Sequence, residues 1–173
     1  MIQIICGTNR NDALSLQVSK IYQSILKELG HDSNIIDLTE LPEDFVFTAL
    51  YDNAGKNPAF NSFRETMTAA EKQVFVVPEY NGSFPGVLKA FIDGLKFPDT
   101  FTNKKAALIG VSSGVQGAGL ALSHLTDIFN YCGMHVLAYK VKLMHIEDHL
   151  NNDVLGEEYM KYLKRQAKAF TEF

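Results

Sequence analysis

Five short apolar runs alternate with five amphipathic stretches along the whole chain, and this alternation constrains the fold more than any other feature. The runs are rich in Ile and Val and are flanked by turn residues, as is typical of strands buried on both faces of a parallel sheet. Strands that alternate with helices predict an α/β sandwich of three layers, with helices on both faces of a five-stranded parallel sheet. The expected strands are Ile2–Cys6, Asn34–Leu38, Gln73–Val77, Ala106–Val111 and His135–Val141.

The helices are predicted from apolar residues spaced three and four apart and from residues that favour helix ends. The first helix has Ser15 as a candidate N-cap and ends at Gly30, and the last covers about Asp153 to Phe173. The three between them are marked by Asn57 with Pro58 at the start of the second, Pro85 at the start of the third and Gly133 at the end of the fourth.

Length and charge place limits on the class of protein. A chain of 173 residues is the size of one domain, so residues 1–173 are expected to form a single unit. The net charge of −4 disfavours a nucleic-acid partner, and no apolar run is long enough for a membrane span. The start lacks a basic leader, and Cys6 and Cys132 do not suggest a disulfide framework, so a cytoplasmic location is expected.

The long segment Leu41–Asn57 has no clear pattern but carries large apolar side chains such as Phe45, Phe47 and Tyr51. A solvated loop would not need them. The segment is expected either to fold over a helix, or to form a subunit contact or a wall of the active site.

Ligands of open α/β sheets bind outside the carboxyl ends of the strands, and three loops there have unusual sequences. The loop after the first strand precedes a helix, whose N-terminal N–H groups favour an anion. It adds hydroxyl donors from Thr8 and Ser15 and the fixed charge of Arg10. It contains neither a Walker A motif nor a dinucleotide fingerprint. A phosphate bound without Mg²⁺ chemistry is the functional interpretation, and a plain cap with a surface charge is the alternative.

The loop after the third strand runs from Pro78 to Gly86 and is dense in backbone amides and aromatic rings. Asn81-Gly82 favours a turn, but Pro85 begins a helix rather than a return strand, which argues against a hairpin. Such a surface suits a flat heteroaromatic ligand.

The loop after the fourth strand has three glycines between Ser112 and Gly119, in an order that does not match a dinucleotide fingerprint. Glycine lets a backbone approach a ligand closely, although a tight crossover into the helix would also use it. Together the three loops predict a mononucleotide site with an anion end and two walls for a planar base.

The residues Gly7–Arg10 and Pro78–Lys89 closely resemble those of the NAD(P)H-dependent FMN reductases, a flavodoxin-like family that includes azoreductases and quinone reductases. The resemblance implies an FMN-dependent NAD(P)H:acceptor oxidoreductase that reduces flavins, quinones or azo compounds by ping-pong hydride transfer through FMN N5. It also implies a homodimer or homotetramer. The implied FMN contacts are Thr8, Arg10 and Ser15 for the phosphate; Pro78, Glu79, Tyr80, Asn81 and Gly82 for the ring; and Ser112, Ser113, Gly114, Gln116 and Gly117 for its pyrimidine side.

The chain differs from the family pattern at two positions, and two other functions of the fold remain possible interpretations. Family members commonly have Ser and then Asn where this chain has Ala13 and Leu14, so the phosphate loop has two fewer polar groups. A flavodoxin-like electron carrier and a non-catalytic module are the other readings of the fold. The modest charge and Arg10 disfavour the carrier, and a colourless purified protein would favour the module.

A metal site is not expected. His145 and His149 are four residues apart, with Glu147 and Asp148 between them, but they follow the fifth strand and are interpreted as a solvated connection. No residue is assigned as a general acid or base, because the cofactor carries the chemistry.

Overall fold

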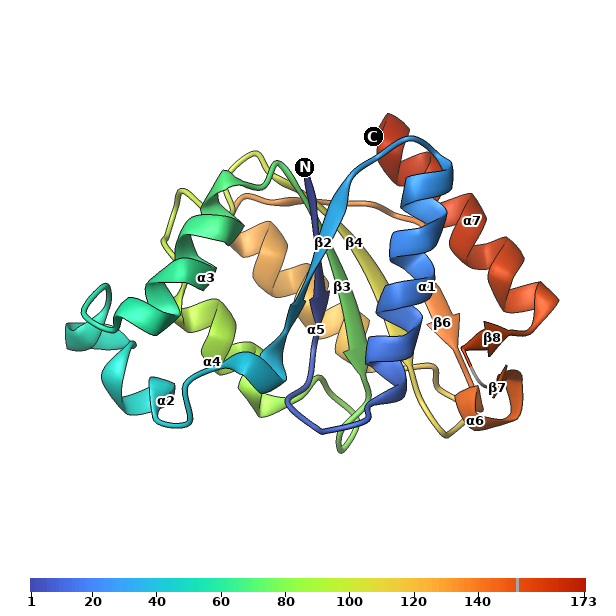
Figure 1. Cartoon of the computed structure of the whole chain (residues 1–173), viewed down its shortest axis with the longest axis horizontal. Coiled ribbons are helices and arrows are strands. Elements are labelled where there is room, and N and C mark those ends of the chain that lie inside the picture. The colour runs from blue at the N-terminus through green and yellow to red at the C-terminus, as the bar shows by residue number, and fades with distance from the viewer. Residues whose placement is uncertain (152) are drawn as a thin grey trace.

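The computed structural model of the protein describes residues 1–151 and 153–173 and is built around a parallel sheet (Figure 1). The strand order is β2-β1-β3-β4-β5, and β6 also pairs with β4. Every pairing in this sheet is parallel. The strands are β1 (Ile2–Cys6), β2 (Ser33–Asp37), β3 (Lys72–Pro78), β4 (Lys105–Val111), β5 (His135–Val136) and β6 (Val141–Leu143).

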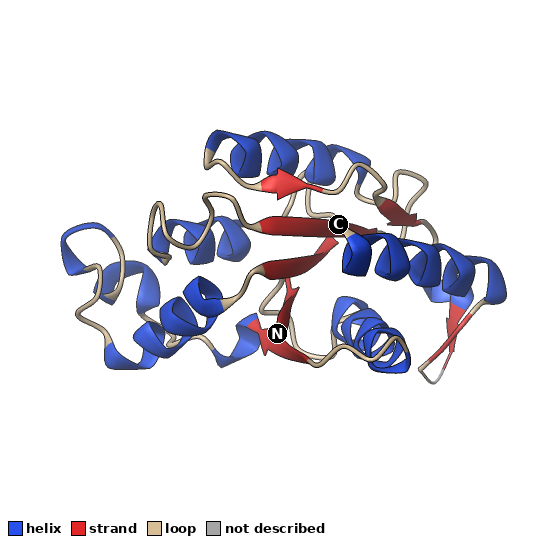
Figure 2. Cartoon of the chain, turned by 90° about the horizontal axis from the view of Figure 1, so that it is seen from above, coloured by secondary structure: helices blue, strands red, loops and turns tan. Residues whose placement is uncertain are grey.

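Helices cover both faces of the sheet, as the end-on view shows (Figure 2). Neighbouring side chains of a strand point to opposite faces, so Ile4 packs with the core under α1 and α7, whereas Ile5 packs with the core under α3, α4 and α5. The expected three layers are therefore confirmed. The helices are α1 (Leu14–Glu28), α3 (Pro58–Ala69), α4 (Gly86–Gly94), α5 (Gly119–Tyr131) and α7 (Glu157–Glu172).

Two predicted helix starts are wrong. Helix α1 has Ala13, not Ser15, at its N-cap, and Ser15 lies buried in the first turn with its Oγ 3.5 Å from Cys6 Sγ. Helix α7 starts at Glu157 rather than Asp153, because β7 (Leu150–Asn151) and β8 (Val154–Leu155) form a small antiparallel pair before it. By contrast, Asn57 caps α3 as predicted, accepting the N–H of Phe60 at 3.1 Å.

The predicted fifth strand is two pieces rather than one. Between β5 and β6 the ladder to β4 is interrupted, and the buried side chain of Gln166 fills the gap. Its amide nitrogen donates to Leu108 O at 2.9 Å and to Tyr139 O at 2.8 Å. Gln166 thus replaces backbone donors that an unbroken strand would supply, and it ties α7 to the sheet.

The irregular segment 41–57 folds over α3 and α4, which confirms the first of its interpretations. It follows the 3₁₀ turn η1 (Leu38–Glu40) and contains the short helix α2 (Phe45–Thr48) and the 3₁₀ turn η2 (Tyr51–Asn53). Phe45 stacks on Phe60 of α3, with ring centroids 5.4 Å apart. Phe47 and Tyr51 point outward and are about four-fifths exposed.

Within residues 1–151 and 153–173, no helix combines the length and the apolar character that crossing a membrane requires.

Replacing Gln166 with Leu is expected to destabilise the fold, because the carbonyls of Leu108 and Tyr139 lose their donor inside the core. A buried carbonyl left unpaired costs about 1–3 kcal/mol. Urea unfolding followed by circular dichroism measures the change. Lys164→Ala, two residues away, breaks only an exposed ion pair with Glu28 and should change stability by less than about 1 kcal/mol. Equal stability of both variants would show that Gln166 does not support the broken strand.

Candidate functional site

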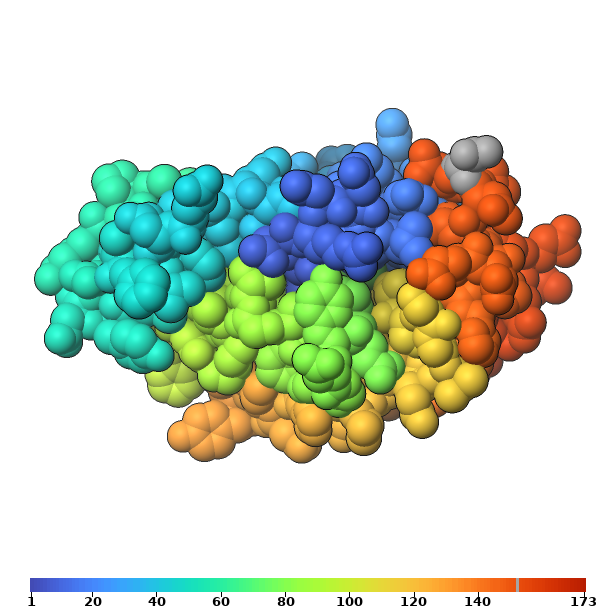
Figure 3. Space-filling model, turned by 90° about the horizontal axis from the view of Figure 1, so that it is seen from below, coloured from blue at the N-terminus to red at the C-terminus, as the bar shows by residue number. Residues whose placement is uncertain are grey.

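The carboxyl ends of β1, β3, β4 and β6 meet at one edge of the sheet, and the segments that follow them surround a shared hollow. Figure 3 shows this face, where the first loop, the loop around residue 80, the loop around residue 114 and the segment after β6 come together. Both chain termini lie at the opposite end of the molecule (Figure 1).

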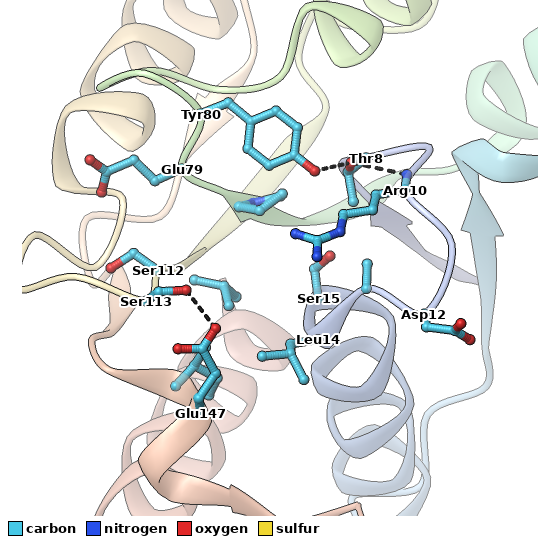
Figure 4. Close-up of a pocket in the computed structure, with 14 residues that line it drawn as sticks. Thr8, Arg10, Asp12, Leu14, Ser15, Glu79, Tyr80, Ser112, Ser113 and Glu147 are labelled. Carbon is cyan, nitrogen blue, oxygen red and sulfur yellow. Dashed lines mark hydrogen bonds between the residues drawn. The ribbon is translucent and has the colours of Figure 1, made fainter.

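The first loop supplies a positive end. Helix α1 has no side-chain cap at Ala13 and no acidic residue in its first turn, so its first N–H groups are free for an anion. Arg10 directs its guanidinium toward the middle of the hollow (Figure 4). In the part of the chain that the structure describes, no carboxylate forms an ion pair with Arg10. A free guanidinium beside an uncapped helix end favours a phosphate.

Thr8 and Tyr80 join the first two loops. Their hydroxyl oxygens are 2.8 Å apart, and the N–H of Arg10 donates to Thr8 Oγ1 at 3.2 Å (Figure 4). Thr8 is almost fully buried, whereas Tyr80 is about one-third exposed. The Tyr80 ring therefore forms a wall of the hollow in a position fixed by a hydrogen bond.

The second loop contains a hairpin turn, which contradicts the prediction from Pro85. Tyr80 and Ser83 exchange two backbone hydrogen bonds of 2.8 and 3.0 Å, and Asn81 and Gly82 between them both have positive φ. These are the features of a two-residue primed turn, which needs no long return strand. The turn projects Asn81 and Gly82 beyond the hollow that Pro78, Glu79 and Tyr80 line.

Glu79 joins the second loop to the third. Its Oε2 accepts the N–H of Ala118, the N-cap residue of α5, at 3.0 Å, and its own N–H donates to Val111 O. The carboxylate is directed away from the centre of the hollow (Figure 4). Glu79 therefore holds the start of α5 in place.

Eight of the predicted site residues line the hollow together, and five do not. The five are Asn81, Gly82, Gly114, Gln116 and Gly117. At Gly117, with φ +54°, a Cβ would lie 2.7 Å from Lys142 Cβ, so this glycine is required by packing against β6. At Gly114 a Cβ would meet no atom within 4 Å, so its surroundings are open. The eight are Thr8, Arg10, Ser15, Pro78, Glu79, Tyr80, Ser112 and Ser113.

The sequence interpretation missed the segment after β6. Residues Ile146–His149 form the short helix α6. Its polar side chains are exposed, as predicted, but Ile146 and Glu147 also line the hollow. Ser113 Oγ donates to Glu147 Oε1 at 2.7 Å (Figure 4). The place of this segment in the sequence could predict its role, because it also follows the carboxyl end of a parallel strand. The described residues contain no group of three or more metal-ligating side chains.

Apolar side chains complete the anion end. Ala13 and Leu14 line the hollow next to Ser15 and offer no side-chain hydrogen bonds. Beneath them, burial raises the pKa of the Cys6 thiol above its ordinary value, while the hydrogen bond with Ser15 opposes the shift. Cys6 is thus a neutral, buried thiol under the loop rather than a reactive group.

The chain is similar to several known proteins in sequence and in fold. Residues 1–149 match the family model described as NADPH-dependent FMN reductase. An NAD(P)H-dependent FMN reductase of Schizosaccharomyces pombe is 34% identical over 99% of this chain and 88% of its own length. A 2-hydroxy-1,4-benzoquinone reductase of a Burkholderia species is 27% identical over 94% of this chain and 90% of its own. Among solved structures, the flavoenzyme NAD(P)H:(acceptor) oxidoreductase FerB of Paracoccus denitrificans has a TM-score of 0.80 at 23% identity, covering 99% of this chain and 94% of its own.

The two glycines of the third loop should respond differently to alanine. Gly117→Ala is expected to lower stability by at least about 1–2 kcal/mol, because Ala is strained at positive φ and its Cβ would clash with Lys142. Gly114→Ala, the matched control three residues earlier, should change stability by no more than about 0.5 kcal/mol. Thermal unfolding of the protein without ligand compares them. A stable Gly117→Ala variant would show that this glycine is not required by packing.

Proposed function

Because the chain belongs to the NADPH-dependent FMN reductase family, and is therefore an FMN-dependent NAD(P)H oxidoreductase, we propose that the hollow at the carboxyl edge of the sheet holds the FMN. The observation that carries this proposal is the free positive end formed by Arg10 and the uncapped start of α1. The fold is flavodoxin-like, as the structural relatives indicate.

The phosphate would be held at this positive end. Arg10 offers a charged donor pair, and the first N–H groups of α1 point out of the helix end. The hydroxyls of Thr8 and Ser15 lie beside them in the lining. Ala13 and Leu14 add no hydrogen bonds, so Arg10 carries a larger share of the phosphate affinity than it would in a loop with more polar side chains.

The ring would lie between the second and third loops. Pro78 and Tyr80 offer flat surfaces on one side, and Ser112 and Ser113 line the other. Five of the predicted contacts lie outside this lining: Asn81 and Gly82 in the turn, and Gly114, Gln116 and Gly117 in the third loop. We assign Asn81 and Gly82 to the outer edge of the site, Gly114 and Gln116 to backbone contacts, and Gly117 to support of the loop.

When bound, FMN would supply the redox chemistry, a two-electron transfer from NAD(P)H to a second acceptor through N5 in ping-pong order. The protein orients the ring, leaves one of its faces open and stabilises charge on its N1–C2=O edge. Backbone N–H groups of the third loop are suited to the last task. The loop supplies them without a titrating side chain, so no general acid or base is assigned.

Small, planar electron acceptors are the proposed second substrates. Relatives of this chain are named for quinones and for FMN, and an azoreductase shares the fold. An open face that receives NAD(P)H and the acceptor in turn favours loose specificity toward flavins, quinones and azo compounds. We place the enzyme in the cytoplasm, where its reductant is available.

We further propose a homodimer or homotetramer. A groove between α4 and α5 is lined mainly by apolar side chains, together with Lys89, Asp93 and Asp127. Two aromatic rings are exposed at it, Phe97 at 66% and Tyr131 at 88%. Exposed apolar patches of this kind are typical of protein contacts.

Arg10→Ala is expected to weaken FMN binding about 10- to 100-fold, because a charge-assisted hydrogen bond contributes about 1.5–3 kcal/mol. Titration of apoprotein with FMN, followed by quenching of flavin fluorescence, measures the dissociation constant. Lys168→Ala removes the same charge from an exposed position on α7 and should leave affinity unchanged. An unchanged dissociation constant for Arg10→Ala would remove this residue from the phosphate site.

Tyr131→Glu is expected to convert the oligomer to smaller species, because a carboxylate would be buried in the α4–α5 contact. Light scattering coupled to size-exclusion chromatography gives the mass. Leu29→Glu, which alters an exposed apolar residue at the far end of α1, should keep the wild-type mass. A Tyr131→Glu variant that retains the wild-type mass would place the contact elsewhere.

A further inference from the structure

The segment His145–Glu147 holds the third loop by its carbonyl groups. Ile146 N–H donates to Ser112 O at 3.1 Å, and His145 N–H donates to Gly114 O at 3.2 Å. His145 Nδ1 lies 3.1 Å from the carbonyl oxygen of Ser113 between them. A carbonyl only accepts, so this ring nitrogen carries the hydrogen. Three consecutive carbonyls are therefore bound to one short segment.

A carbonyl and the next N–H belong to one peptide plane and point in opposite directions. With the carbonyls of Ser112, Ser113 and Gly114 fixed toward α6, the following N–H groups face away from it. Among residues 1–151 and 153–173, no acceptor bonds the N–H of Ser113, Gly114 or Val115. The arrangement leaves a row of backbone donors for a ligand of the loop.

The Ser113 hydroxyl is oriented by the same segment. Its hydrogen points to Glu147 Oε1, at 2.7 Å, so its oxygen offers only lone pairs to a ligand. Ser113 lines the hollow and can thus accept a ligand N–H beside the row of backbone donors. Donors next to an acceptor match the C2=O and N3–H groups of a flavin's pyrimidine edge.

His145 adopts a left-handed backbone conformation that residues other than glycine uncommonly take, with φ 44° and ψ 46°. In this conformation His145 makes both the main-chain bond to Gly114 and the ring bond to Ser113. A non-glycine residue in the left-handed region costs stability and persists where surrounding contacts hold it. Here those contacts are the bonds to the third loop.

We propose that His145 and Glu147 are positioning residues that set the donor pattern of the third loop and thereby the preference of the site for reduced over oxidised FMN. The inference rests on the proposed location of FMN. Reduction places negative charge on the N1–C2=O edge of the ring, and fixed N–H donors stabilise that charge more than they stabilise the neutral edge. Loosening the loop should therefore weaken binding of reduced FMN more than binding of oxidised FMN.

His145→Gly is the sharpest test. Glycine adopts the observed φ without strain and keeps the N–H to Gly114, so only the ring donor to Ser113 is lost. The preference for reduced FMN should fall about tenfold, which lowers the two-electron midpoint potential by about 30 mV. His145→Asn should restore it, because Asn tolerates this backbone region and its side-chain amide can donate. The potential is measured against a reference dye under anaerobic conditions.

A variant of Glu147 distinguishes its role as a hydrogen-bond acceptor from an effect of its negative charge. Glu147→Gln keeps an oxygen that accepts from Ser113 and should leave the potential near that of the wild type. If Glu147 acted mainly through its negative charge, the same change would raise the potential. Asn103→Gly, at another position with positive φ and far from the site, is the control for backbone effects and should change nothing.

The outcomes distinguish the two proposals. If the wild-type apoprotein binds no FMN, the proposed FMN site is wrong, and if Arg10→Ala leaves the affinity unchanged, Arg10 is not part of the phosphate site. If FMN binds as proposed but His145→Gly keeps the wild-type potential, the positioning role is overturned. A raised potential in Glu147→Gln overturns the role given to Glu147 alone.

Discussion

Hydrogen bonds between the loops determine the shape of the site. Thr8 with Tyr80 joins the first loop to the second, Glu79 with Ala118 joins the second to the third, and the segment after β6 holds the third by its carbonyls. Each loop is thus positioned by its neighbour as well as by its strand. A hollow lined by several short loops can stay in place without a ligand because these bonds are internal to the protein.

The sheet makes these bonds possible. Parallel strands end at one edge, and the strand order places the loops after β1, β3 and β4 side by side. Two apolar cores fix the strands from both faces, with Phe75 on one side and Val76 on the other. The positive end at Arg10, the aromatic wall at Tyr80 and the donors of the third loop are consequently adjacent, although they are far apart in the sequence.

Much of the fold could be predicted from the sequence, because buried strands and amphipathic helices carry strong periodic signals. The wrong predictions concern element boundaries that are determined by tertiary contacts. Gln166 allows the fifth strand to break, and nothing local to His135–Val141 indicates a side chain from the last helix. Ser15 has the right chemistry for a cap, but the N-cap is Ala13, two residues earlier.

The candidate site likewise has parts that the sequence predicts and parts that depend on tertiary contacts. The loops that follow strands were recognisable, and eight of their predicted residues share the hollow. Glu147 was missed because a polar stretch after a strand is usually solvated, and its bond to Ser113 depends on how β6 is placed. Gly117 is predicted to contact the ligand, and its surroundings add a second reason for glycine, because a side chain there would clash with Lys142. The sequence alone does not show why a position requires glycine, because the answer depends on the atoms around it in the fold.

The most direct test of the account is an anaerobic titration of the FMN-loaded protein with NADPH and, separately, with NADH, followed by the absorbance of the bound flavin. Rapid bleaching by one equivalent of at least one nucleotide is predicted, with recovery of colour when a quinone is added. Flavin that binds in the site but stays oxidised with both nucleotides would contradict the account, because the protein would then bind FMN without accepting hydride from NAD(P)H.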